Sequence, residues 1–170
     1  MTYLDPTFRE QTGPDADTGR RQSQLLESYL NNAWISWTPT IGASSGSPTL
    51  GNGTFPAVYK RLGSACFGYG KLTLGTTTSF GVGPLTITLP FASTKAEYRL
   101  IGTWHAFHLG GTVMAIGTLR TQNSTTLCDF VYPVTAPSGA ATQVSGGSAT
   151  PWGWAATDFI DIQFCYEVGK

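Results

Sequence analysis

The sequence has little charge for its length. Only 12% of its 170 residues are charged, and ten basic residues are balanced by ten acidic ones. No block of like charge occurs, so the clustered lysines and arginines that bind phosphate are missing and a nucleic-acid partner is disfavoured. A net charge of zero gives one copy little repulsion against another, which favours oligomerisation or assembly into a larger structure.

Long hydrophobic runs are also missing. The roughly 18 consecutive apolar residues that a membrane span needs occur nowhere in the chain. The start, from Met1 to Pro6, has neither a basic segment nor an apolar one, so a secretory signal peptide is not expected. The sequence therefore predicts a protein without membrane insertion.

Cysteine and histidine are too scarce for a metal or redox site. Cys66, Cys128 and Cys165 lie far apart and form no C-x-x-C pair, so we expect three reduced thiols that are mostly packed in the interior. The histidines, His105 and His108, are three residues apart near a strand end. In a straight strand this spacing places them on opposite faces, so no shared metal and no cofactor are expected.

Motifs for catalysis are absent as well. The sequence has no G-x-S-x-G elbow and no phosphate-binding glycine loop. Asp158 and Asp161 fall at the start and on the polar face of one strand, which does not form an acid and base pair. Asp15, Asp17 and Gly19 resemble the beginning of a calcium loop but lack its later ligands, and helix capping explains them better. A non-enzymatic protein is predicted.

What the chain does contain divides near Trp34. Residues 1–33 hold eight of the twenty charged residues, whereas residues 34–170 hold all five tryptophans. The first region has the pattern of a polar arm with one helix from Arg21 to Asn32, capped by Asp17 or Thr18. The second region is rich in glycine, threonine and aromatic residues, which is typical of a β protein.

The predicted helix has one apolar side. That side, together with two tryptophans at the start of the second region, is expected to anchor the chain or to form an oligomer interface. These residues are Leu25, Leu26, Tyr29, Leu30, Trp34 and Trp37. Because a helix of about three turns is marginal alone in water, its apolar side must pack on the second region, on other copies or on another protein.

From Trp34 onward, apolar residues alternate with polar ones, with glycine-rich turns between the runs. Eight strands are predicted: Ala33–Ile41, Ala57–Leu62, Ala65–Leu74, Leu85–Leu89, Tyr98–Phe107, Thr112–Leu119, Thr126–Tyr132 and Phe159–Val168. No helical pattern interrupts them, so the predicted fold class is all-β: a jelly-roll-like β-sandwich head preceded by an N-terminal arm and one short α-helix. Residues 136–153 lack a strand pattern and are expected to form a long surface loop.

Trp152 and Trp154 stand at the end of this expected loop. Exposed indole rings there are candidates for contact with glycan, because sugar rings stack on aromatic faces. The ordinary alternative is that both tryptophans fill the core or a subunit interface, as tryptophan in a β-sandwich most often does.

Six segments of the chain are informative together for their order and spacing. They are Trp37-Thr38-Pro39-Thr40, Pro48-Thr49-Leu50-Gly51-Asn52-Gly53-Thr54, Tyr59-Lys60-Arg61-Leu62-Gly63, Leu72-Thr73-Leu74-Gly75-Thr76-Thr77-Thr78, Leu85-Thr86-Ile87-Thr88-Leu89-Pro90 and Asp161-Ile162-Gln163-Phe164-Cys165-Tyr166-Glu167. These segments resemble the β heads of tailed-bacteriophage virion proteins. Proteins of this class are capsid decoration proteins, head fibres, and minor tail or fibre-tip proteins, commonly trimers with an N-terminal anchor. One departure is that this chain has no room for a long shaft between arm and head.

The resemblance implies a non-enzymatic virion surface protein, made in the host cytoplasm. It would be a homotrimer in which residues 1–33 bind the major capsid protein or a tail protein and residues 34–170 form the displayed head. Shell decoration and attachment to a host cell-surface glycan both remain open. Two further alternatives are a free carbohydrate-binding module and an enzyme, of which the second lacks any convergent catalytic group.

Overall fold

The computed structural model describes residues 19–24, 27, 33–95, 97–111, 113–122, 126–135, 141–145 and 151–169. The chain divides into two compact units, Met1–Ala33 and Trp34–Lys170. In the first unit, residues 19–24 and 27 are helical. The expected apolar side of this helix, formed by Leu25, Leu26, Tyr29 and Leu30, lies outside the described residues.

The described part of the second unit consists of β-strands and connections. Its strands are β1 (Ile35–Trp37), β2 (Ile41–Ser45), β3 (Ala57–Leu62), β4 (Ala65–Thr73), β5 (Val82–Thr88), β6 (Leu100–His108), β7 (Val113–Thr121), β8 (Leu127–Thr135), β9 (Ala141–Ser145) and β10 (Phe159–Glu167). All of their pairings are antiparallel. The predicted all-β fold class is confirmed.

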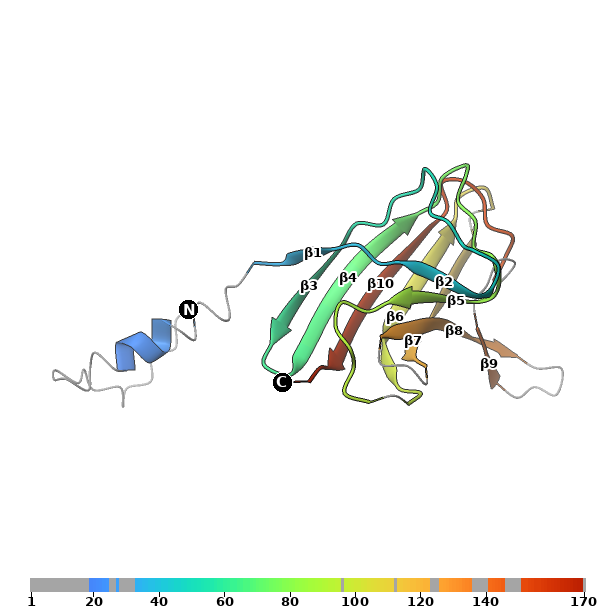
Figure 1. The fold of residues 1–170 in the computed structure, drawn as a ribbon. Helices are drawn as coiled ribbons and strands as arrows, with labels where there is room; N and C mark the ends of the chain where they lie inside the picture. The colour runs from blue at the N-terminus through green and yellow to red at the C-terminus, as the bar shows by residue number, and fades with distance from the viewer. Residues whose placement is uncertain are drawn as a thin grey trace, which may run out of the picture. The chain divides into compact units, whose positions relative to one another are not determined.

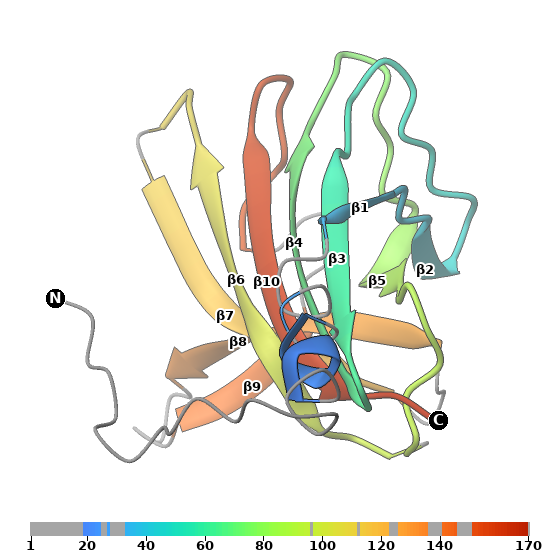
Figure 2. The same ribbon diagram turned by 90° about the vertical axis from the view of Figure 1, so that its left-hand side faces the viewer.

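The strands form one sheet that curls back on itself. Its order is β1-β3-β4-β10-β6-β7-β8-β5-β2, with β9 added beside β8. If this sheet were flat, β1 and β2 would lie about 38 Å apart at a spacing of about 4.8 Å per strand. Yet only residues 38–40 join them, and the step from Trp37 to Ile41 spans at most about 15 Å. The sheet therefore curls into two layers, with β2, β5 and β8 on the opposite side of the core from β3, β4, β10 and β6 (Figures 1 and 2).

The hydrophobic core fills the space inside the curl. Side chains from both layers are fully buried there, including Leu72, Ile87, Leu119, Phe130 and Ile160. β10 shows how the sequence directs side chains into this core. Buried and more exposed residues alternate along the whole strand, so every second side chain points inward. As predicted, the even-numbered residues face the core: Ile160, Ile162, Phe164 and Tyr166.

Trp104 ties the two layers together. Its indole Nε1 donates a hydrogen bond to the backbone carbonyl of Val131, 3.1 Å away, and its ring packs edge-on against Phe130 and Tyr132. The ring lies directly against Gly117, where a Cβ atom would collide with it and with the Val131 carbonyl. Glycine at this position therefore lets β6, β7 and β8 approach closely.

Three predicted segments differ from the structure. The segment expected as one strand, Ala33–Ile41, is two strands, because Pro39 cannot donate to a ladder and the chain crosses there from one end of the sheet to the other. β5 begins at Val82, earlier than predicted, through the turn of Gly81 and Gly83, both at positive φ. The expected loop 136–153 contains β9, which pairs with β8.

Candidate functional site

Several polar side chains gather on the outside of the curl. In β4, β10 and β6 the core residues alternate with side chains that point away from the core. We call the side of these strands that carries Tyr69, Asp161 and His105 the outer face. In Figure 2 the viewer looks toward this layer of the sheet, with β8 passing behind it.

Strand register arranges the outer face in rows that run across the strands. Lys71 of β4 lies opposite Asp161 of β10, which in turn lies opposite His105 of β6. In the row one pleat further along, Tyr69, Gln163 and Thr103 occupy the same three strands. Because Cα partners in neighbouring strands bring their side chains close together, each row is a line of neighbouring side chains.

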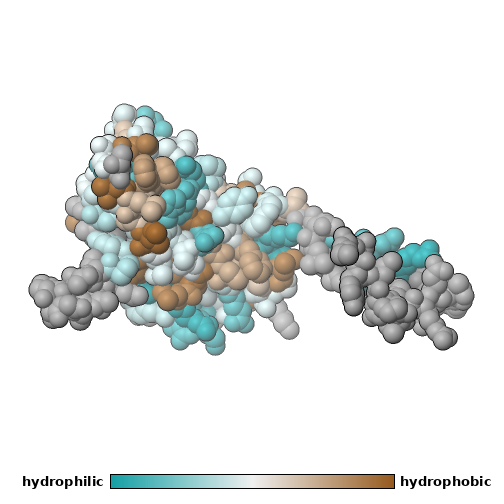
Figure 3. All heavy atoms as spheres, turned by 180° about the vertical axis from the view of Figure 1, so that it is seen from behind, coloured by the Kyte–Doolittle hydropathy of each residue, from teal (hydrophilic) through white to brown (hydrophobic). Residues whose placement is uncertain are grey.

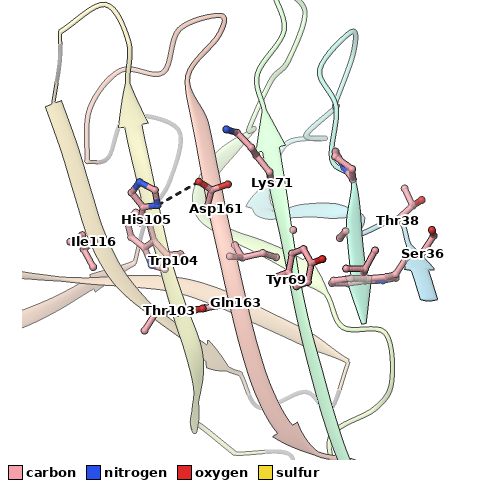
Figure 4. Close-up of a pocket in the computed structure, with 16 residues that line it drawn as sticks. Ser36, Thr38, Tyr69, Lys71, Thr103, Trp104, His105, Ile116, Asp161 and Gln163 are labelled. Atoms are coloured by element: carbon pink, nitrogen blue, oxygen red, sulfur yellow. Dashed lines mark hydrogen bonds and ion pairs between the residues drawn. The ribbon is translucent and has the colours of Figure 1, made fainter. Parts of the chain in front are cut away.

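A groove of about 890 Å³ runs between these two rows. Lys71, Asp161 and His105 line one side, Tyr69, Gln163 and Thr103 line the other, and Gly70, Ile162 and Trp104 contribute to the lining between them. Ile116 of β7 stands at one end, and Ser36, Thr38 and Val58 stand at the other. Figure 4 shows the two rows of side chains projecting from the neighbouring strands.

The charged row partly neutralises itself. His105 Nδ1 and Asp161 Oδ2 are 3.5 Å apart, and about 40% of each side chain is exposed. On the other side of Asp161, the Lys71 ammonium lies 3.8 Å from the ring centre of Phe159, a cation–π contact. Phe159 also stacks with Phe107 and meets the His105 ring edge-on, so a shelf of aromatic rings borders the charged row.

The second row is neutral. The Gln163 side-chain amide donates a hydrogen bond of 2.9 Å to the Thr103 hydroxyl, which fixes the amide across two strands. Tyr69 is 52% exposed, and its ring meets Trp34 edge-on at a centroid distance of 5.0 Å. This row therefore offers an aromatic face beside amide and hydroxyl groups.

The two tryptophans at the start of the head both lie near the groove, since Trp37 lines it and Trp34 contacts the groove residue Tyr69. Trp34 is exposed and contacts Tyr69 on the outer face. Trp37 is half-buried and packs edge-on against the core residue Phe164. Their predicted role in anchoring or oligomerisation stays a prediction.

Trp152 and Trp154 form a second aromatic group away from the groove residues. Both are half-buried against the core, and their rings lie 5.2 Å apart. Trp154 meets Phe80 edge-on, and Trp152 lies beside the ring of His108. The Trp152 indole nitrogen is buried and has no hydrogen-bond partner among the described residues. Their predicted glycan contact stays a prediction, but most of each indole is covered.

Asp158 holds this aromatic group in place. Its carboxylate is fully buried and accepts hydrogen bonds from the backbone nitrogens of Leu109 and Ala155, at 3.1 and 2.9 Å. The same carboxylate pairs with His108 Nδ1 at 2.8 Å. Asp158 and Asp161 thus each pair with a histidine rather than with each other: Asp158 pairs with His108, and Asp161 pairs with His105.

Two thiols and one tyrosine hydroxyl are buried in the core. Burial raises the pKa of the Cys66 and Cys128 thiols and of the Tyr166 hydroxyl. All three cysteines are free, as predicted, although Cys165 is exposed and only the other two are packed. In the described ranges no group of three or more histidine, cysteine, aspartate or glutamate residues could hold a metal ion, and no helix there is long and apolar enough to cross a membrane.

Sequence reasoning missed the groove because its rows depend on long-range pairing. His105 and Asp161 are 56 positions apart and meet only because β10 inserts between β4 and β6. The available signal was the alternation of β10, which placed Asp161 and Gln163 on a common outward side.

Comparison with known proteins gives no assignment for the chain. No protein-family model matches it, and neither a curated protein nor a solved structure gives a significant match.

Proposed function

We propose that the protein is a non-enzymatic structural protein of a bacteriophage particle, in which the second unit is a displayed β head and the first unit is its anchor. The observation that carries the proposal is the division of the chain at Trp34 into a short N-terminal unit and an all-β unit. A tether followed by a compact head suits a protein held at a surface. The resemblance of several head segments to phage virion proteins supports the same class.

Exposed apolar side chains support association of the head with further copies. The β6–β7 hairpin carries Leu109, Val113 and Met114, each about half exposed. Water-exposed apolar groups gathered at one place mark interaction surfaces. Figure 3 shows hydrophobic residues in separate patches among neutral ones on the side opposite to that of Figure 1. We assign the hairpin to the contact between copies in a homotrimer.

Light scattering of the full chain tests the trimer. We expect a mass three times the 18.1 kDa of one chain at micromolar concentration. The double variant Leu109→Asp with Met114→Asp should reduce this mass to that of the monomer, because the new charges cannot be buried at the contact. Val82→Asp is the matched control, since Val82 is 63% exposed on β5, outside the hairpin. A monomeric wild-type chain, or a control variant that dissociates equally, contradicts the trimer.

Removal of the arm tests the anchor. Particles of the source phage that lack this protein should bind the full chain, and a chain without residues 1–20 should bind them far more weakly. Tryptophan fluorescence and an unchanged unfolding midpoint would show that the shortened chain keeps its head fold, since all five tryptophans lie in residues 34–170. Equal binding by both chains contradicts the anchor assignment. Electron microscopy of the particle then distinguishes shell decoration, with many copies, from a tail position with few.

A non-enzymatic role is supported by the chemistry of the groove. His105 and Asp161 are its nearest acid and base, but both are open to water and each is held in a row of structural contacts. The nearby Thr103 hydroxyl already accepts a hydrogen bond from Gln163. The free carbohydrate-binding module is the second candidate, favoured by the groove, and it predicts ligand binding that is unaffected by loss of the arm.

A further inference from the structure

The geometry points to the transverse groove of the outer face as a binding site for a neutral, linear oligosaccharide. This inference does not depend on where the protein sits on a virion. It assigns the ligand to Tyr69, Gln163, Thr103, Asp161 and His105, rather than to Trp152 and Trp154. The size, the side-chain chemistry and the direction of the groove carry it.

The size of the groove matches a small ligand of several rings. Its volume of about 890 Å³ lies in the upper part of the roughly 300–1,000 Å³ range of small-molecule sites. It is lined by residues from six strands, from Ser36 of β1 to Ile116 of β7. A long, open groove of this kind suits a chain of sugar rings better than a single one.

The side chains along the groove match the two kinds of surface that a sugar ring has. A pyranose ring offers apolar C–H groups on its face and hydroxyl groups, both donors and acceptors, around its edge. Tyr69 supplies an aromatic face, and Trp34 packs edge-on against its ring. Gln163 and Thr103 supply amide and hydroxyl groups, and Asp161 supplies a carboxylate that accepts hydrogen bonds from ligand hydroxyls.

The charge of the groove favours a neutral ligand. The carboxylate of Asp161 lies between Lys71 and His105 in the same row, so an anionic ligand would meet Asp161 and a cationic one would meet Lys71. Oligosaccharides without acidic or amino groups avoid both repulsions. Their hydroxyls can also replace the water that now solvates the half-exposed His105 and Asp161 side chains.

The direction of the groove argues against a peptide or a second copy as the occupant. An extended peptide binds a sheet by pairing with an edge strand, but the groove runs across β4, β10 and β6, whose backbone groups are already paired on both sides, and reaches the edge strand β1 only at one end. A second copy would have to bury the charged row of Lys71, Asp161 and His105 at a protein contact, where charged residues are depleted.

An array of neutral linear oligosaccharides tests the site. The probes are glucans, mannans, xylans and N-acetylglucosamine oligomers of four to eight sugars, and calorimetry with the full chain then measures the affinity of each hit. We expect at least one hit. Tyr69→Ala should weaken it about tenfold by removing the aromatic face, and Gln163→Ala about fivefold by removing one hydrogen-bonding group.

Matched control variants lie on the same strands and the same face. Phe67→Ala removes an aromatic ring of β4 one pleat from Tyr69, and Glu167→Gln alters an exposed group of β10, and neither residue lines the groove. Both variants should keep wild-type affinity. Unfolding midpoints in urea confirm that each variant is folded before its affinity is compared.

Four outcomes overturn the inference. One is the absence of binding by every probe at millimolar concentration. Another is equal loss of affinity in Tyr69→Ala and its control Phe67→Ala. A third is loss of binding in Trp152→Ala together with unchanged binding in Tyr69→Ala and Gln163→Ala. This result would place the ligand on the aromatic group of Trp152 and Trp154. The last is a change of oligomer mass in Tyr69→Ala without any glycan binding, which would make the groove a contact between copies.

Discussion

Stability at alkaline pH should depend on one buried thiol. Cys128 lies in β8 between β5 and β7 and is fully buried. Burial, and secondarily the neighbouring carboxylate of Asp129, raises the pKa of this thiol well above its ordinary value of 9.0. In the unfolded chain the thiol returns to that ordinary value, so folding keeps a proton that the unfolded state loses.

The sign and size of the effect follow from this difference. Below pH 9 the thiol is protonated in both states, and its contribution to stability is complete. As pH rises above 9, only the unfolded chain ionises, and the free energy of unfolding falls by about 1.4 kcal/mol per pH unit. At pH 10.5, which is 1.5 units above the ordinary pKa, ionisation of the Cys128 thiol in the unfolded chain should lower the free energy of unfolding by about 2 kcal/mol.

Urea unfolding followed by tryptophan fluorescence measures this loss. Wild type and Cys128→Ala are compared from pH 7 to 10.5 with a reductant present, so that no thiol is oxidised. Cys66 and Tyr166, whose pKa values are also raised, titrate in both proteins, so the difference between the two curves reports chiefly on Cys128. Wild type should lose about 2 kcal/mol more than the variant. Cys165→Ala, which removes an exposed thiol, should follow wild type. Parallel curves for wild type and Cys128→Ala would refute the reasoning.

Three substitutions should lower the free energy of unfolding of the head, measured with urea, because each leaves a buried polar group unpaired or overpacks the sheet. Arg120→Ala removes the two hydrogen bonds, of 2.6 and 3.2 Å, that hold the buried carboxylate of Asp129, and it should cost about 3 kcal/mol; an unchanged midpoint would contradict a buried pair. Gly117→Ala should cost at least about 1–3 kcal/mol by overpacking the sheet, whereas Gly153→Ala, which meets nothing within 4 Å, should be nearly neutral. Asp158→Asn should cost about 1–3 kcal/mol because it weakens the three hydrogen bonds made by a fully buried carboxylate, and a variant as stable as wild type would contradict this role.

Local patterns were sufficient to predict most strands. β3 has the predicted bounds, and β10 has the predicted alternation, because in both cases one face of the strand is buried and the other is not. The break between β1 and β2 had one local signal, Pro39, but its second cause, the crossing of residues 38–40 between the two layers, depends on the whole sheet. β9 lacks an apolar pattern and exists through its pairing with β8.

The candidate site was beyond the reach of local patterns. The sequence drew attention to Trp152 and Trp154 because tryptophans in a glycine-rich segment are conspicuous, yet both rings are largely covered. Tyr69, Gln163 and His105 are individually unremarkable residues of three separate strands. They form a groove only because the register of β4, β10 and β6 aligns them, and register across distant strands is set by the whole sheet.

The position of β10 has a consequence for how the chain reaches its fold. The last strand lies between β4 and β6, so during synthesis these two strands remain without their shared neighbour until residues 159–167 have emerged. Until then the sheet exists as two pieces, each with an open edge able to pair with another chain. Closure over so long a sequence separation is slow. A chain that lacks β10 is thus the form of this protein most exposed to aggregation, and this nine-residue strand joins two half-sheets with open edges into one sheet.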